Sequence, residues 1–191
     1  YSRLVDALLA AGIEPWLTLY HWDLPEFLPG GWLERDTASR FAEYASAVHC
    51  GLGDRVKVWT TLNEPWCSSF LAHAGGEHAP GHTDPAEAVR VAHHLMLAHG
   101  LGVQALRAQG ADQVGIVLNF TPVVPADPES PADLDIVRRI DGTANRFFIE
   151  AILTGGYPAD VLEDLGDWWA SDLVRPGDAE LIAAPIDLLG V

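Results

Sequence analysis

The chain has 191 residues, and its 27 acidic side chains outnumber its 11 lysines and arginines, which gives a formal net charge of −16. This charge argues against nucleic acids and anionic membranes as partners, because proteins bind both with lysine and arginine. Hydrophobic residues make up 49% of the chain and charged residues 20%, values typical of a globular protein with a buried core. The longest nearly apolar stretch, from Ala7 to Ile13, is far shorter than the roughly 20 residues that cross a bilayer. We therefore expect a soluble protein.

The start of the chain and its cysteine content bear on where the protein resides. The first residue is Tyr1, and no basic segment followed by an apolar stretch marks a secretory signal. Cys50 and Cys67 could form at most one bridge, far below the density of small secreted scaffolds. We therefore expect a cytoplasmic protein, with part of its sequence missing before Tyr1.

The first third of the chain alternates helical patterns with short β-branched or apolar runs, as βα units do. Tyr1 to Ala11 places its leucines and valine on one helical face, and Pro15 to Tyr20 reads as a strand. A second helix is expected over about Thr37 to Cys50, with Asp36 as its N-cap. Val56 to Leu62 alternates apolar and other residues, which predicts a second strand.

The rest of the chain continues the same alternation. A long helix is expected from Pro85 to Gln109, because Asp84 can cap it, Pro85 suits the first helical position and Glu87 can complete a capping box. A third strand, another helix and a fourth strand are expected over Val114 to Phe120, Ser130 to about Leu153, and Ile186 to Val191.

This order predicts an α/β fold with a parallel sheet. A (β/α)₈ TIM barrel needs about 250 residues for eight strands, so a chain with about four strands would supply half of one. The competing architecture is a doubly wound open sheet, which is less favoured because no glycine-rich phosphate-binding motif follows any strand.

The order of the elements also separates the two cysteines. Cys50 closes a helix at one face of the sheet, and Cys67 follows a strand that runs to the opposite face. We predict no disulfide between them.

Polar side chains follow three of the four strands, where a packed core would not place them. In a barrel these strand ends meet at one face, so the side chains would converge on one pocket. A carboxyl, an imidazole and carboxamides suit a neutral polyol such as a sugar, and Trp22 and Trp66 offer flat apolar faces. The polar residues are His21, Asn63, Glu64 and Asn119.

Glu64 is the candidate for catalysis. A glutamate in a loop ordinarily caps a helix or forms a salt bridge, but Glu64 directly follows a buried strand and has Trp59 and Trp66 nearby in sequence. Pro65 disfavours the helical conformation at Glu64, so we expect an extended backbone there. Partial desolvation beside aromatic rings favours the neutral carboxyl that a general acid requires.

Four segments resemble glycoside hydrolase family 1, and its bacterial β-glucosidases in particular. Their order and spacing along successive strands make the combined match specific, and the similarity runs the whole length of the chain. The segments are Leu19-Tyr20-His21-Trp22-Asp23-Leu24-Pro25, Thr61-Leu62-Asn63-Glu64-Pro65, His78-Ala79-Pro80-Gly81 and Asp187-Leu188-Leu189-Gly190-Val191.

The resemblance implies a retaining β-glucosidase that removes terminal β-D-glucosyl residues through a glycosyl-enzyme intermediate. Glu64 matches the acid/base, Asn63 the residue that binds the sugar 2-hydroxyl, and His21 with Trp22 the pair that binds the glycone. The nucleophile would be a second glutamate beyond residue 191. The substrate would be a small β-glucoside or oligosaccharide, and no cofactor is implied.

The resemblance also implies that residues 1–191 are a single partial TIM-barrel catalytic domain, truncated at both ends. They would comprise about strands 3 to 6 with the intervening helices, and would be inactive alone. Leu71 to Glu77 departs from the family's usual rim sequence, which leaves the aglycone preference open. Cys67 and His78 are candidates to line that rim.

Two other functional classes compete with this interpretation. A non-catalytic carbohydrate-binding or interaction module could keep the cleft without a second carboxylate. A metal-dependent hydrolase could use histidines, but their spacing matches no zinc template, and neighbouring helical residues such as His93 and His94 project about 100° apart. We expect no metal site among His73, His78, His82, His93 and His94.

Overall fold

The computed structural model describes all 191 residues and centres on a parallel sheet of four strands in the order β1-β2-β3-β4. Each strand lies beside the strand that precedes it in the chain, as in the wall of a barrel. The strands are shorter than the sequence predicts, and their order matches the prediction. They are β1 (Trp16–Tyr20), β2 (Val58–Asn63), β3 (Gln113–Val117) and β4 (Leu188–Gly190).

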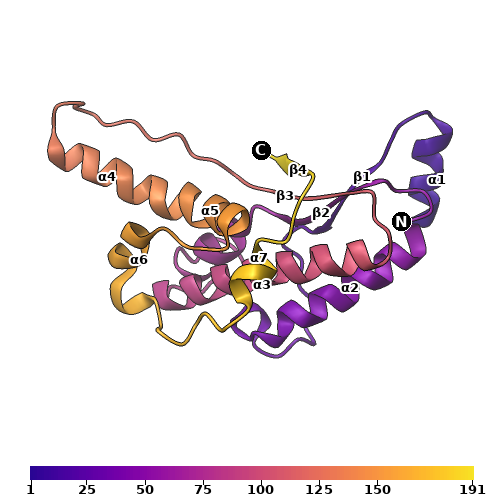
Figure 1. The fold of residues 1–191 in the computed structure, drawn as a ribbon, viewed down its shortest axis with the longest axis horizontal. Coiled ribbons are helices and arrows are strands. Elements are labelled where there is room, and N and C mark those ends of the chain that lie inside the picture. Colours follow the sequence, from indigo (N-terminus) through magenta and orange to yellow (C-terminus); the bar gives the residue numbers. More distant parts are fainter.

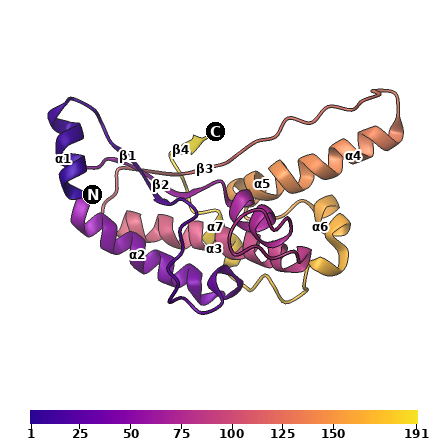
Figure 2. The same ribbon diagram turned by 180° about the vertical axis from the view of Figure 1, so that it is seen from behind.

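Seven α-helices accompany the sheet, and α2 and α3 lie together along one side of it (Figure 1). Helix α4 and the loop before it project away from the sheet, as the view from behind also shows (Figure 2). No helix is long and apolar enough to cross a membrane. The helices are α1 (Ser2–Ala10), α2 (Asp36–Leu52), α3 (Pro85–Ala108), α4 (Pro131–Asp141), α5 (Phe147–Thr154), α6 (Ala159–Leu165) and α7 (Asp178–Ile182).

Strand β2 is buried on both faces. The sequence predicts alternation along it, yet four consecutive residues, from Trp59 to Leu62, are all fully buried. A parallel strand between two others is covered by helices on one face and by side chains of the barrel interior on the other, so its burial is continuous. The strand is partly exposed at both ends, and its C-terminal end carries Asn63 and leads into Glu64.

The helix starts were predicted only in part. Asp84 caps α3 and accepts hydrogen bonds from the N–H groups of Ala86 (2.9 Å) and Glu87 (3.4 Å), as predicted. The capping box is wrong, because the Glu87 carboxylate pairs with His82 over 2.6 Å and the N–H of Asp84 donates to a main-chain oxygen. Asp36 is wrong as the N-cap of α2: it is the first helical residue and binds Arg40 one turn later.

The single helix predicted from Ser130 to about Leu153 is interrupted. A π-helical turn, Gly142–Arg146, separates α4 from α5. Within this turn Asn145 binds both main-chain groups of Thr121, accepting from its N–H and donating to its oxygen, each over 2.9 Å. The interruption therefore ties the helices to the loop that leaves β3.

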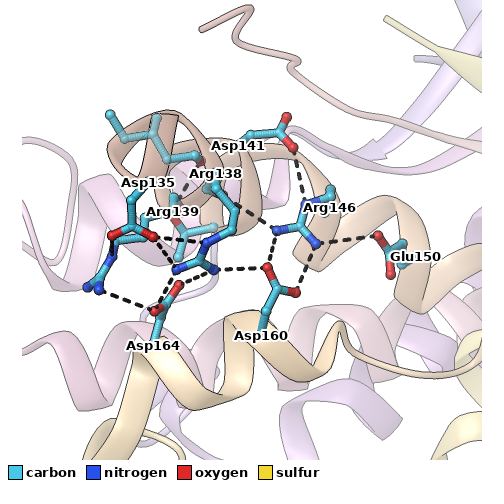
Figure 3. Close-up of polar contacts among 10 residues, drawn as sticks. Asp135, Arg138, Arg139, Asp141, Arg146, Glu150, Asp160 and Asp164 are labelled. Carbon is cyan, nitrogen blue, oxygen red and sulfur yellow. Dashed lines mark hydrogen bonds and ion pairs between the residues drawn. The ribbon is translucent and has the colours of Figure 1, made fainter. Parts of the chain in front are cut away.

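Helix α6 is fastened to α4 and the π-helical turn by ion pairs (Figure 3). Arg138 donates to Asp160 (2.9 Å) and Asp164 (2.8 Å), and Arg146 donates to Asp160 over 2.7 and 3.0 Å. Hydrogen bonds from the two arginines hold the pKa of the Asp160 carboxyl well below its usual range. Beside these partly exposed ion pairs, Val161 and Leu165 of α6 are buried in the core.

A buried charge joins three further segments. The carboxylate of Asp178, at the start of α7, pairs with Arg35 and lies 3.1 Å from Nε2 of His93. Burial opposes this charge, but hydrogen bonds from Arg35 and the Arg175 N–H keep the pKa of Asp178 below its usual value. Tyr157 lies 2.8 Å from the other ring nitrogen of His93. The network connects α2, α3 and α7 across the helical layer.

Candidate active site

The predicted site residues lie where β1 and β2 end. Tyr20 pairs with Leu62 across the two strands, so the residues that follow them emerge side by side. Trp22 donates its indole N–H to the main-chain oxygen of Asn63 over 3.0 Å. The loop after β1 is therefore bonded directly to the end of β2, and His21, Trp22, Asn63 and Glu64 share one edge of the sheet.

Aromatic rings form one wall of this edge. The imidazole of His21 lies edge-on to the Trp22 ring, with ring centres 5.0 Å apart, and His78 packs on Trp22 at 4.9 Å. A hollow of about 310 Å³ opens between the end of β1 and the segment that carries His78. Its lining is Tyr20, Trp22, Asp23, Ser68, His78 and Ala79.

Trp22 and Glu64 both adopt left-handed backbone conformations, with φ values of +78° and +46°. No other non-glycine residue in the chain has a positive φ. The extended conformation predicted for Glu64 is therefore wrong: Pro65 excludes the right-handed helical region, and the chain turns through the left-handed one instead. Such conformations cost about 1–3 kcal/mol each and concentrate at functional sites.

The main chain of Glu64 is held from both sides. Its N–H donates to the oxygen of Val117 in β3 over 2.9 Å, and its oxygen accepts from the N–H of Cys67 over 2.9 Å. These bonds place the residue between a strand and the π-helical segment Cys67–Leu71. The side chain is half-buried at the open end of the strand.

The carboxylate of Glu64 has one side-chain partner. The thiol of Cys67 donates to its Oε2 over 3.3 Å, and the carboxamide of Asn119 lies 3.9 Å from the sulfur. Burial, with a smaller contribution from Glu64, raises the pKa of the Cys67 thiol to about 12, so it stays protonated at neutral pH. The sequence suggested a rim position for Cys67; the structure buries it beside Glu64.

The other two tryptophans near this edge, Trp59 and Trp66, pack in or against the core. Trp59 is fully buried and packs against His49, with ring centres 5.0 Å apart. Trp66, expected to offer a flat face to a sugar, stacks on Phe70 and packs against the core. Trp22 is thus the tryptophan at the site, where the residue is 39% exposed.

Two buried histidines, His73 and His94, each contact a different main-chain oxygen. His73 is buried and lies 3.1 Å from the main-chain oxygen of Ser68, and His94 lies 2.9 Å from that of Trp32. No group of three or more His, Cys, Asp or Glu side chains is arranged to hold a metal ion. Both cysteines are free, as predicted.

A larger cavity, of about 990 Å³, lies apart from these groups. It runs between the loop after β1 and helix α2, and its lining includes Leu24, Phe27 and Tyr44. None of His21, Trp22, Asn63 and Glu64 borders it. Of these four residues, Trp22 lines the smaller hollow, and the two cavities share Tyr20 and Asp23.

Comparisons with known proteins agree on one family. The model for Glycosyl hydrolase family 1 matches residues 1–191. The chain is 52% identical to thermostable beta-glucosidase B of Thermobispora bispora, and 46% identical to a bifunctional beta-D-glucosidase/beta-D-fucosidase of Bifidobacterium breve. It aligns over its whole length with both, and covers 39% and 42% of them. The chain thus spans about two fifths of the curated relatives it matches.

Solved structures give the same result. A psychrophilic β-glucosidase from Micrococcus antarcticus superposes with a TM-score of 0.97 and 53% identity, over 100% of this chain and 41% of that one. The family 1 β-glucosidase of Thermotoga maritima in complex with isofagomine lactam superposes with a TM-score of 0.93 and 39% identity. The match covers 99% of this chain and 43% of that one. The four strands are therefore part of a (β/α)₈ barrel, as the sequence predicted.

Proposed function

Because the chain belongs to glycosyl hydrolase family 1, we propose that it forms part of a retaining β-glucosidase in which Glu64 is the general acid/base. The observation that carries this proposal is the placement of the Glu64 carboxyl. It stands at the open end of β2, held by main-chain bonds on both sides, beside the loop that presents His21 and Trp22. Relatives named as β-glucosidases support the substrate class.

The proposed reaction has two steps. In the first, Glu64 gives its proton to the glycosidic oxygen as the bond to the anomeric carbon breaks, and a second carboxylate forms a glycosyl ester with that carbon. In the second, Glu64 takes a proton from a water molecule that attacks the anomeric carbon and releases the second carboxylate. We place that second carboxylate, the nucleophile, outside residues 1–191.

The remaining site residues would bind the sugar. The Trp22 N–H is already bonded to Asn63, so Trp22 offers its ring face, and His21 and the carboxamide of Asn63 can exchange hydrogen bonds with hydroxyl groups. Residues 1–191 would form one partial catalytic domain of a longer chain, and a small β-glucoside or oligosaccharide would be the substrate. The two free cysteines support a cytoplasmic location.

The test compares two leaving groups in the full-length protein. Glu64→Gln should lower kcat/KM for cellobiose by about 10²–10⁴-fold, because its leaving group needs a proton. A dinitrophenyl β-glucoside needs none, so its glycosylation rate should be spared, and the slow second step should produce a burst. Glu163→Gln, at an exposed glutamate on α6, is the matched control and should behave as the parent.

Two results would contradict the assignment. One is a Glu64→Gln enzyme that hydrolyses cellobiose as fast as the parent. The other is turnover of a β-glucoside by residues 1–191 alone, since covalent catalysis requires both carboxyls. A protein that binds β-glucosides but never hydrolyses them would instead be a carbohydrate-binding module.

A further inference from the structure

We propose that Cys67 is a positioning residue for the acid/base: its thiol holds Oε2 of Glu64, so that Oε1 carries the proton exchanged with the substrate. This inference rests on the proposed function of Glu64 and assigns a role to a side chain outside the sugar-binding set. The observation behind it is the 3.3 Å contact between Sγ and Oε2, the single side-chain hydrogen bond of the Glu64 carboxylate.

The main chain makes this contact a fixed one. The N–H of Cys67 donates to the oxygen of Glu64 over 2.9 Å, so the two residues are joined by a main-chain bond as well as by the side-chain bond. Cys67 opens the π-helical segment Cys67–Leu71 and is only 5% exposed. The thiol therefore has little freedom to leave the carboxylate.

A second contact sets the direction of the bond. Nδ2 of Asn119, which follows β3, lies 3.9 Å from Sγ and can donate only, so the sulfur accepts from it. The thiol proton is then free to point at Oε2 of Glu64, which accepts it whether or not Oε1 carries a proton. The result is a chain of donors that runs from Asn119 through Cys67 to Oε2. The raised pKa of the thiol keeps this donor in place across the neutral range.

The arrangement divides the two carboxyl oxygens between two tasks. With Oε2 engaged by the thiol, the transferable proton sits on Oε1. In the first step the Oε1–H bond breaks and the proton goes to the departing sugar oxygen. In the second step the proton returns from water to Oε1. A donor on Oε2 keeps the carboxyl from rotating.

The competing explanation is that Cys67 only fills space. Three variants of the full-length protein separate the two explanations: Cys67→Ser keeps a donor, Cys67→Ala removes it, and Cys67→Val removes it while keeping the volume. Cys50→Ala is the matched control, because Cys50 is the other cysteine of the chain and is exposed on α2. Thermal unfolding identifies any variant whose change in rate comes from instability.

The expected effect on the rate differs between the two substrates. Cys67→Ala and Cys67→Val should lower kcat/KM for cellobiose about two- to fivefold more than for the dinitrophenyl glucoside, the size expected for a weak S–H donor. Cys67→Ser and Cys50→Ala should keep the parent's ratio of the two rates. The parent's ratio in Cys67→Ala and Cys67→Val would overturn the proposal, as would a Cys67→Ser variant as impaired as Cys67→Ala.

A double-mutant cycle separates this proposal from the one it rests on. If Glu64→Gln fails the leaving-group test, the acid/base assignment falls. If it passes, Cys67→Ala added to Glu64→Gln should have no further selective effect, since the two residues act through one bond. An additive effect would show that Cys67 acts elsewhere. The S–H stretching band, isolated as the infrared difference between the parent and Cys67→Ala, should shift when Glu64 becomes glutamine.

Discussion

The indole N–H of Trp22 and the main-chain oxygen of Asn63 are joined by a 3.0 Å hydrogen bond between residues 41 positions apart in the chain. The bond uses the polar atom of the tryptophan for structure and leaves its ring to the hollow. It also ties the left-handed turn at Trp22 to the end of β2, next to Glu64. The geometry of the loop after β1 and that of Glu64 are therefore linked.

Replacing Trp22 with phenylalanine should break that link while keeping an aromatic ring. The lost bond is a neutral one, worth about 1 kcal/mol, so KM for cellobiose in the full-length protein should rise about fivefold or more. The mechanism of proton transfer is untouched, so the ratio of rates on cellobiose and the dinitrophenyl glucoside should stay constant. Trp168→Phe, at an exposed tryptophan far along the chain, is the control. An unchanged KM would show that the bond does not position the ring.

Acid should destabilise the fold before most carboxylates protonate. His93 and His99 are fully buried, and burial lowers the pKa of each to about 4, against about 6.5 in an unfolded chain. Between these values the unfolded chain binds protons that the folded chain does not. The stabilisation is therefore complete above pH 6.5 and is lost as the pH falls toward 4.

Between pH 7 and pH 4 the free energy of unfolding should fall by about 3 kcal/mol per histidine. The measurement is the lowering of the unfolding midpoint of the full-length protein over this pH range. His99→Leu should flatten this dependence, whereas the same change at the exposed His21 should not. A midpoint equally sensitive to pH in both variants would contradict the assignment. Because His93 also touches Asp178, His99 is the cleaner test.

Gly100 and Gly51 should respond to alanine in opposite ways. A β-carbon on Gly100, in α3, would overlap the main-chain oxygen of Leu181 in α7, so the variant should lose about 1–3 kcal/mol through overpacking. A β-carbon on Gly51, in α2, meets nothing within 4 Å and should gain up to about 1 kcal/mol from helix propensity. Thermal unfolding of the two variants measures both. A stable Gly100→Ala would show that α3 and α7 are less closely packed.

Arg138→Gln should loosen α6. Arg138, on α4, binds Asp160 and Asp164 of α6, and the variant would remove this partner from both carboxylates. Amide hydrogen exchange across Ala159–Leu165 should speed up, and the difference from the parent should shrink at high salt because the contacts are partly exposed. Arg40→Gln, which removes exposed pairs within α2, should leave α6 unchanged. Equal exchange in the parent and Arg138→Gln would contradict this role.

The order of strands and long helices was predictable because local signals mark it. Asp84 and Pro85 begin α3 through contacts within one turn, and the structure confirms that start. The short helices α6 and α7 were not predicted, since contacts from distant segments hold them: Arg138 for α6, and Arg35 for α7. The interruption between α4 and α5 depends on the bonds of Asn145 to another loop, which no local pattern reveals.

The same distinction applies to the site. His21, Trp22, Asn63 and Glu64 were predictable as neighbours because parallel strands bring their ends together, and the structure places them at one edge. The bond between Cys67 and Glu64 was not predictable from the sequence, because it depends on the left-handed turn at Glu64. That turn is set by β3, through the oxygen of Val117.

The two left-handed residues bear on any selection for heat-resistant variants of this protein. Glycine adopts positive φ without strain, so a library screened for heat resistance alone would be drawn toward glycine at positions 22 and 64. Each such change would relieve local strain and remove a side chain that we propose to act in sugar binding or catalysis. Codons 22 and 64 should therefore be held constant, and any screen should require turnover as well as survival at high temperature.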